Sequence, residues 1–209
     1  MEALKTLVPV FGVFIPALLL PGPDFIGVVR SAMTRGTAGG LRTTVGVSMG
    51  LGFYATLSLL GLSAVLAEYQ WLTWAIRALG GAYLAFLGIK LLRAKPLGAA
   101  DVMTPPVRGN AFIFGFLVTL TNPKAIVIFA SVFATAVTGS TPSWLMALMI
   151  GLVVLSALVW YSIVTLFMSS APVMRRFQHA RHWIERAAGA CFVAIGVRIL
   201  ADARSPVTP

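Results

Sequence analysis

The amino-acid sequence predicts an all-α integral membrane protein with six transmembrane helices, arranged as two inverted repeats of three helices in which the first and fourth helices are broken. Three observations lead to this fold class. The 209-residue chain is 58% hydrophobic and only 11% charged, whereas a soluble domain carries about 25% charged residues. Its apolar residues fall into long segments separated by short tracts. Two stretches of the first half also recur, in the same order, in the second half.

The second observation concerns the length and number of the apolar segments. A membrane-spanning helix needs about 20 apolar residues. Six segments reach this length, at residues 4–35, 40–67, 71–93, 110–137, 142–168 and 183–203. The proline-containing linker 96–108 divides them into a first repeat at 1–95 and a second at 109–209. We therefore expect one membrane domain covering residues 1–209.

The basic residues indicate how the chain lies in the membrane. The net charge is +10, and Lys and Arg concentrate in the tracts after the first, third and fifth segments. Cytoplasmic loops of membrane proteins carry this excess of cations. The charge therefore indicates cytoplasmic loops and not a nucleic-acid partner, and both termini are expected outside the cytoplasm.

Two pairs of similar stretches support the inverted repeat. Gly81 and Gly88 align with Gly189 and Gly196 at a constant offset of 108, and a cation follows two residues after the second glycine in both stretches. Chance recurrence of small residues is the alternative for the glycines alone. Because each repeat has an odd number of crossings, the second would be inverted relative to the first. Such an architecture lets a carrier present one site alternately to each side of the membrane.

The first and fourth segments are each interrupted by a proline beside a charged residue. The breaks are Pro21-Gly22-Pro23-Asp24 and Asn122-Pro123-Lys124, and they align at an offset of 100. A proline inside a helix leaves backbone groups that lipid cannot satisfy. Paired interruptions in corresponding positions of two halves indicate the substrate site of a transporter.

The residues of each break have separate expected roles. At 1.5 Å per residue, both breaks fall near the bilayer midplane. Pro23 and Pro123 suit the first turn of the half-helix that follows, where the missing N–H costs nothing. Asp24 would then lie at the positive end of that helix. Gly22 is expected to adopt a backbone conformation closed to other residues and to allow a close approach by a ligand or the other half.

The two breaks together carry complementary charges. Asp24 could bind a substrate ammonium group or carry a coupling proton, Lys124 could bind a carboxylate, and Asn122 supplies neutral donors and an acceptor. These groups complement a zwitterion. Two alternatives stay open: a structural salt bridge between Asp24 and Lys124, and simple helix capping by Asp24.

Further polar side chains on the second and fifth segments are expected either to line a pathway or to form interhelical hydrogen bonds. They are Thr43, Thr44, Ser48, Tyr54, Thr56, Ser58, Tyr161, Ser162 and Thr165.

Several classes of function are disfavoured. No metal or cofactor is expected, since the single Cys191 stands alone and His179 and His182 lie in a basic tract expected to be a loop, with no carboxylate cluster nearby. A membrane-embedded enzyme would need a nucleophile–base pair or a metal cluster. The chain also lacks the Gly-x-x-x-x-Gly-Lys-Ser/Thr loop of an ATP-driven pump. An uncoupled channel or a structural membrane subunit is the alternative to a carrier.

At these residues the chain resembles the LysE/RhtB family of amino-acid exporters. The resemblance rests on the Pro21 to Asp24 segment, the glycine-rich tract 36–52, Gly81 to Leu84 with Gly88 and Lys90, and Asn122 to Ala125. It implies a multi-pass protein of the bacterial inner membrane that exports an amino acid or a close derivative, coupled to the proton gradient and without ATP. It does not identify the amino acid. A carrier of this size is also a candidate homodimer.

Overall fold

The computed structural model describes residues 2–62, 68–93, 109–133, 136, 141–168 and 171–202. The described residues form helices, with no strand among them. This agrees with the all-α class predicted from the composition. The predicted linker 96–108 lies outside the described residues, as do the ends of several predicted segments.

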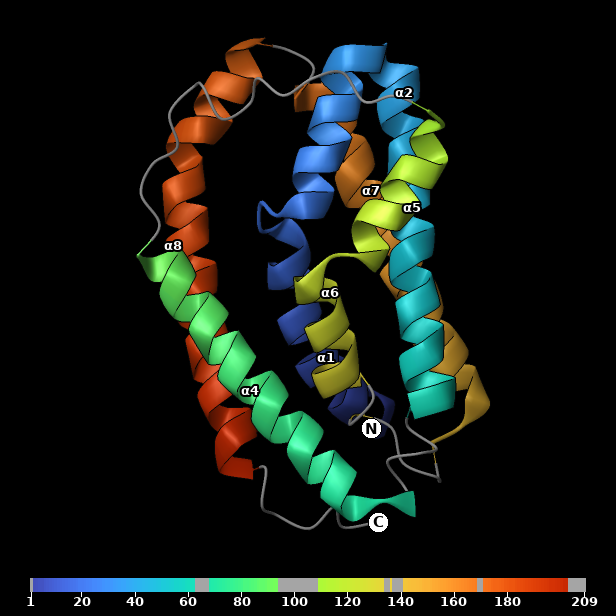
Figure 1. Ribbon diagram of the computed structural model, residues 1–209, viewed down its shortest axis with the longest axis vertical. Coiled ribbons are helices and arrows are strands. Elements are labelled where there is room, and N and C mark those ends of the chain that lie inside the picture. Colours follow the sequence, from blue (N-terminus) through green and yellow to red (C-terminus); the bar gives the residue numbers. More distant parts are fainter. Residues whose placement is uncertain are drawn as a thin grey trace.

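The first two predicted segments form helices α1 (Glu2–Leu19) and α2 (Pro23–Thr56) and a π-helical turn η1 (Leu57–Leu62). Helix α2 reverses direction at Gly36, whose φ of 70° favours glycine. Across this reversal the hydroxyl of Thr43 donates to the hydroxyl of Ser31 at 2.7 Å, although 12 residues of straight helix would span about 18 Å. The two arms of α2 therefore run side by side (Figure 1).

The fourth predicted segment is broken, as expected. It consists of α5 (Ala111–Leu120), α6 (Pro123–Ile128) and the π-helical turn η3 (Phe129–Phe133). The axis bends by 53° between α5 and the part that follows it. The Asn122 side chain caps the start of α6 by accepting a hydrogen bond from the backbone N–H of Lys124 at 3.1 Å. The break is thus a defined change of direction that the Asn-Pro pair stabilises.

The remaining helices are α4 (Gln70–Leu92), α7 (Ser143–Met168) and α8 (Ala171–Asp202). The first two match the predicted segments 71–93 and 142–168. The predicted start of the last segment at residue 183 is wrong, because α8 begins 12 residues earlier and includes His179 and His182. Pro172 suits the first turn of a helix, and the Arg, Gln and Ala residues that follow favour helix in spite of their polarity.

Three described helical stretches are long and apolar enough to cross a membrane, and a fourth is added if the bent pair α5 and α6–η3 counts as one span. The three are Pro23–Gly61, Trp74–Leu92 and Ser143–Phe167. Thr6–Leu19 and Gly189–Ala201 are shorter apolar helices. A straight helix over the 39 residues of Pro23–Gly61 would be about 58 Å long, nearly twice the hydrocarbon core. Because α2 reverses direction at Gly36, the folded stretch is much shorter than this straight helix and closer to the thickness of a bilayer.

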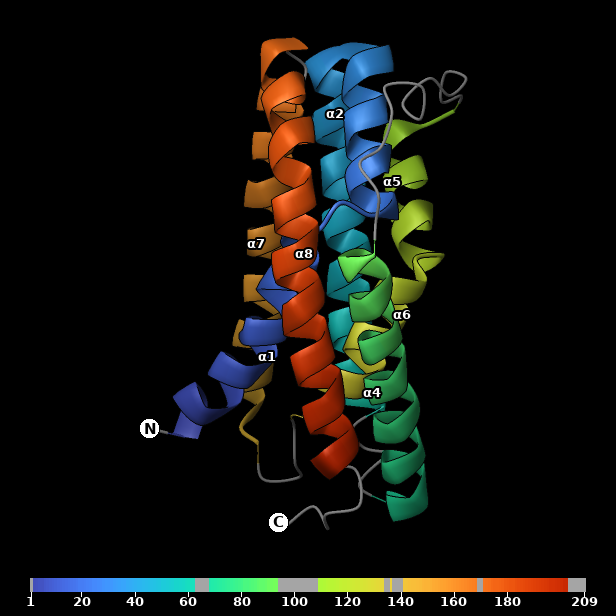
Figure 2. The same cartoon turned by 90° about the vertical axis from the view of Figure 1, so that its left-hand side faces the viewer.

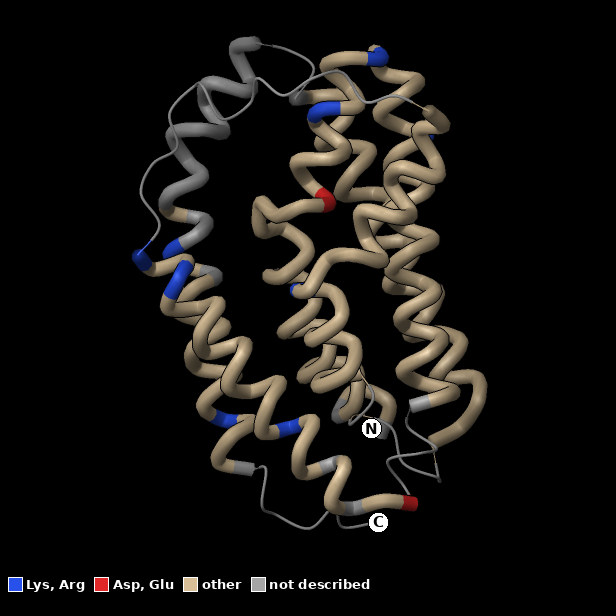
Figure 3. The backbone as a smooth tube through the Cα atoms, viewed as in Figure 1, with Lys and Arg blue, Asp and Glu red and all other residues tan. Residues whose placement is uncertain are grey.

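The helices pack in two groups, with one half of each broken segment between them. Helix α4 packs along α8, and α2 packs against both α5 and α7, while α1 and α6 lie between these groups (Figures 1 and 2). Figure 3 shows how few charged positions the described helices carry. The site described below therefore lies among mainly apolar helices.

Glycines bring α4 and α8 into backbone contact. A Cβ on Gly88 would lie 2.6 Å from the carbonyl oxygen of Gly189, and a Cβ on Gly196 would lie 2.6 Å from that of Gly81. No larger residue fits at these distances. The recurring glycines of the sequence are therefore the points at which these two helices touch.

Candidate substrate-binding site

The first break lies between α1 and α2. Pro23 occupies the first turn of α2, as predicted, and Asp24 follows it in the same turn and is 2% exposed. The prediction of a special backbone conformation at Gly22 is wrong, since its φ of −150° and ψ of −169° are an extended conformation open to any residue. The site is nevertheless close to the other half, since a Cβ on Gly22 would lie 3.1 Å from the Lys124 ammonium nitrogen.

Asp24 is bound by residues of the second break. The hydroxyl of Thr119 donates to its Oδ1 at 3.1 Å, and Nδ2 of Asn122 donates to its Oδ2 at 2.9 Å. Asn122 is 1% exposed, so this amide is committed to Asp24 and to the cap of α6. Pro123 lies in the first turn of α6, as predicted. The structure thus brings Asp24 and Asn122, 98 residues apart in sequence, into direct contact.

Lys124 makes the reverse connection, from the second break to the first. Its Nζ donates to the carbonyl oxygen of Ala17 at 2.8 Å and to that of Leu20 at 3.5 Å. In a continuous helix the Ala17 carbonyl would accept from the N–H of residue 21, which Pro21 lacks. Lys124 supplies this missing donor, and its charge also suits the negative end of a helix dipole.

The charged residues of the two breaks do not pair directly. The described residues include both Asp24 and Lys124, and the hydrogen bonds of each go to other partners. The structural salt bridge left open by the sequence is therefore not the arrangement in this structure. Asp24 does not cap α2 either, since the N-cap residue is Gly22 and no side chain caps this helix; its two carboxylate oxygens accept from Thr119 and Asn122 instead.

Several of the weaker candidates form interhelical hydrogen bonds, one of the two roles expected for them. Thr44 donates to the backbone carbonyl of Tyr161 at 3.2 Å, and Thr43 donates to that of Ala111 at 3.2 Å. Tyr54 is different, because its hydroxyl donates to the Leu120 carbonyl at the end of α5 at 2.7 Å. This bond caps the helix that precedes the second break.

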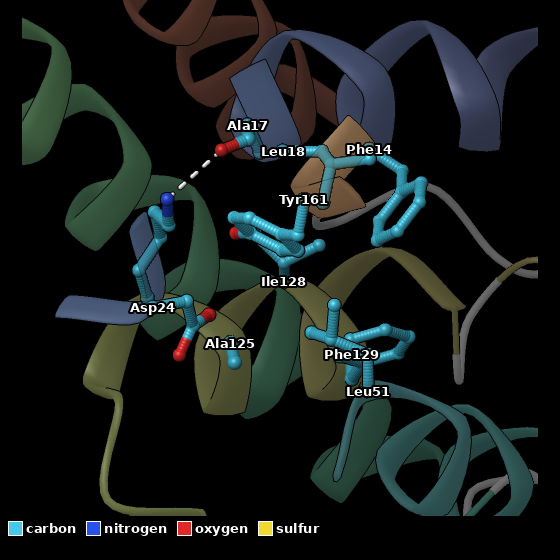
Figure 4. Close-up of a pocket in the computed structure, with 10 residues that line it drawn as sticks. Phe14, Ala17, Leu18, Asp24, Leu51, Ala125, Ile128, Phe129 and Tyr161 are labelled. Carbon is cyan, nitrogen blue, oxygen red and sulfur yellow. Dashed lines mark hydrogen bonds between the residues drawn. The ribbon is translucent and has the colours of Figure 1, made fainter. Parts of the chain in front are cut away.

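A cavity lies beside the two breaks (Figure 4). Its polar lining comes from Asp24, Lys124 and Tyr161. The rest of the lining is apolar and comprises Phe14, Ala17, Leu18, Leu51, Ala125, Ile128 and Phe129. The space that a water-sized molecule can occupy in it is about 20 Å³, room for about one water, so the cavity must widen to take an amino acid. A ligand here would meet one carboxylate, one ammonium group and one phenol within an apolar enclosure.

Sequence reasoning did not identify Thr119, and it ranked Tyr161 below the break residues. Thr119 lies within α5 and no turn or charge marks it. Its role follows only from the packing of α5 against α2, which turns its hydroxyl to Asp24. Among the described residues, no group of three or more His, Cys, Asp or Glu could hold a metal ion.

Comparison with known proteins identifies related sequences over most of the chain. The family described as "LysE type translocator" matches residues 15–203. The "Threonine efflux protein" of Escherichia coli (strain K12) is 33% identical over 196 residues, covering 90% of this chain and 94% of the relative. The protein of the same name in Salmonella typhi is 32% identical with the same coverage. The "Uncharacterized membrane protein YahN" of Escherichia coli is 25% identical over 96% of this chain and 91% of its own length. No solved structure matches the chain.

Proposed function

The chain belongs to the LysE type translocator family, and on that premise we propose that it exports an amino acid from the bacterial cytoplasm. It is a transporter and not an enzyme, and it lies as a multi-pass protein in the bacterial inner membrane. Two relatives that align with nine-tenths of the chain are named threonine efflux proteins. We therefore take small, neutral, hydroxylated amino acids as the proposed substrate class.

The observation that carries this proposal is the pair of opposite charges at one small cavity. Asp24 accepts two hydrogen bonds in this structure, whereas a carboxylate has about four acceptor sites. It can therefore receive a substrate ammonium group without releasing Thr119 or Asn122. A substrate carboxylate would bind Lys124, whose present partners are neutral backbone carbonyls. Ammonium–carboxylate hydrogen bonds are stronger than those to neutral acceptors.

We further propose that the chain is a secondary transporter built from two inverted repeats of three spans, which works by alternating access. The contacts between α4 and α8 support the repeat. Gly81 corresponds to Gly189 and Gly88 to Gly196 in sequence, while in space Gly81 meets Gly196 and Gly88 meets Gly189. Such reciprocal pairing is what a two-fold relation produces. The start of α1 and the end of α8 lie at the same end of the bundle (Figure 1), as an even number of crossings requires.

Proton coupling is the remaining part of the proposal. Asp24 is the one carboxylate in the lining of the cavity, so it is our candidate for the coupling proton as well as for the substrate ammonium group. A group shared in this way would let proton uptake release the amino acid. An uncoupled channel would need no such exchange.

The test is transport of labelled threonine by the purified chain in lipid vesicles, with and without an imposed proton gradient. A coupled carrier accumulates threonine against its concentration gradient, and an ionophore that collapses the proton gradient stops the accumulation. Movement that only equalises the two concentrations would instead support the channel alternative. Absence of movement for every neutral amino acid would contradict the proposed function as a whole.

A further inference from the structure

Tyr161 on α7 has a hydroxyl that no described residue binds. The side chain is 1% exposed and lines the cavity. Its backbone carbonyl accepts from Thr44, but its hydroxyl makes no hydrogen bond to the described part of the chain. Figure 4 shows the ring lying across the cavity, with the hydroxyl turned toward the side where Asp24 lies. Because Tyr161 lines the cavity and its hydroxyl has no partner in the described part of the chain, this hydroxyl can donate to or accept from a ligand there.

Tyr54 provides an internal comparison. Under the proposed repeat, Tyr54 corresponds to Tyr161, at an offset of 107 residues. This offset lies between the 100 residues that relate the two breaks and the 108 that relate the glycine stretches. An aromatic residue precedes each tyrosine. The Tyr54 hydroxyl donates to the carbonyl of Leu120. The residue that corresponds to Leu120 is Leu20, and its carbonyl accepts from Lys124. Lys124 thus takes the acceptor that the repeat would assign to Tyr161, which leaves the Tyr161 hydroxyl for another partner.

We propose that the Tyr161 hydroxyl binds the side-chain hydroxyl of the substrate, so that Tyr161 selects hydroxylated over plain aliphatic amino acids. This inference rests on the proposed function, in which Asp24 and Lys124 bind the charged groups of the substrate. A phenol can both donate and accept, so it suits a neutral hydroxyl. The other residues that line the cavity, among them Phe14 and Leu18, have apolar side chains. A charged substrate side chain would find no further partner there and would be excluded by its desolvation cost.

The test compares threonine with 2-aminobutyrate, which is threonine without its hydroxyl, in transport by the chain in vesicles. The wild-type protein is expected to prefer threonine. In Tyr161→Phe this preference falls about tenfold, the value of one hydrogen bond, because threonine transport falls while 2-aminobutyrate transport is kept. Tyr54→Phe is the matched control. It removes the same atom from the cap of α5, so any loss of transport should affect both substrates equally.

The possible outcomes separate this inference from the proposed function. A wild-type protein that moves no neutral amino acid overturns the proposed function and the inference with it, and one that moves other neutral amino acids but neither of these two compounds overturns the inference alone. A wild-type protein that moves both compounds equally well overturns the role of Tyr161 alone, even if the variant fails to insert. The inference is also overturned if Tyr161→Phe keeps the wild-type preference, or if Tyr54→Phe loses the preference to the same extent.

Discussion

Replacing Asp24 with asparagine removes a charge from the site and leaves its shape. The carbonyl oxygen of the substituted side chain can accept from Nδ2 of Asn122 in the way that Oδ2 of Asp24 does at 2.9 Å. Its amide group can donate to the Thr119 hydroxyl, which then donates to the Gly115 carbonyl that it already approaches at 3.2 Å. The two breaks therefore stay connected by hydrogen bonds. The variant is expected to insert and to fold.

The expected loss of affinity follows from the loss of the charged acceptor. A hydrogen bond to a charged group contributes about 1.5–3 kcal/mol, and the Asp24→Asn variant retains only a neutral acceptor for the substrate ammonium group. A loss of this size corresponds to a fall of about 10- to 150-fold in affinity for the amino acid. Asp24→Ala is the comparison, since it removes the charge and also leaves Asn122 and Thr119 without their acceptor. It should lose stability as well as transport.

The assay measures threonine efflux from preloaded cells at matched amounts of membrane-inserted protein, together with the thermal unfolding midpoint in detergent. Asp24→Asn should abolish export, or uncouple it from the proton gradient, while the midpoint stays near that of the wild type. Wild-type export by a well-inserted Asp24→Asn variant would refute the role of the carboxylate. A large drop in the midpoint would refute the claim that the neutral network keeps the breaks together.

Three further substitutions test other parts of the structure. Lys124→Met should lower transport of a substrate with a free carboxylate about tenfold relative to its amide, and unchanged discrimination between the two would count against carboxylate binding. Gly88→Ala should lower the free energy of unfolding by about 1–3 kcal/mol, because the new Cβ would lie 2.6 Å from the backbone of Gly189; Gly151→Ala, with nothing within 4 Å, is the control. Equal unfolding midpoints for these two variants would contradict the contact. Gly36→Ala should destabilise by about 1–3 kcal/mol, because φ 70° with ψ −177° is a conformation essentially restricted to glycine, and a midpoint at the wild-type value would contradict the strained reversal.

Local chemistry made the breaks and the close contacts predictable. A proline alone does not predict a break, since Pro9 and Pro16 lie inside the continuous helix α1. The sequence predicts the interruptions at Pro21 and Pro123 from a proline together with the charged residue beside it. Glycines spaced along an apolar helix indicate close packing in the same way, and those of α4 and α8 meet backbone to backbone. These signals depend on one residue and its immediate neighbours.

Other features depend on packing between distant segments and could not be read from the sequence. The tract 36–40 holds three glycines, but the packing of the two arms of α2 decides that Gly36 takes the positive φ. Thr119 and Asn122 reach Asp24 because of how α5 is rotated against α2. The early start of α8 was missed because its first turns are basic, and an apolar-segment criterion does not detect them.

At each break, the backbone carbonyls of the preceding helix accept hydrogen bonds from a side chain of the other half. This explains why Asp24 and Lys124, which have opposite charges and stand at corresponding positions, do not pair with each other. The carbonyls at the end of α1 accept from Lys124, and the Leu120 carbonyl at the end of α5 accepts from Tyr54. Tyr54 is neutral and gains little by exchanging its carbonyl for a substrate carboxylate, whereas the ammonium group of Lys124 gains a charged partner. Under the proposed function, substrate binding would therefore withdraw the cap from α1 and leave that of α5 in place. Only the first break would then change its hydrogen bonds when substrate binds. The two similar halves would therefore respond differently to the substrate.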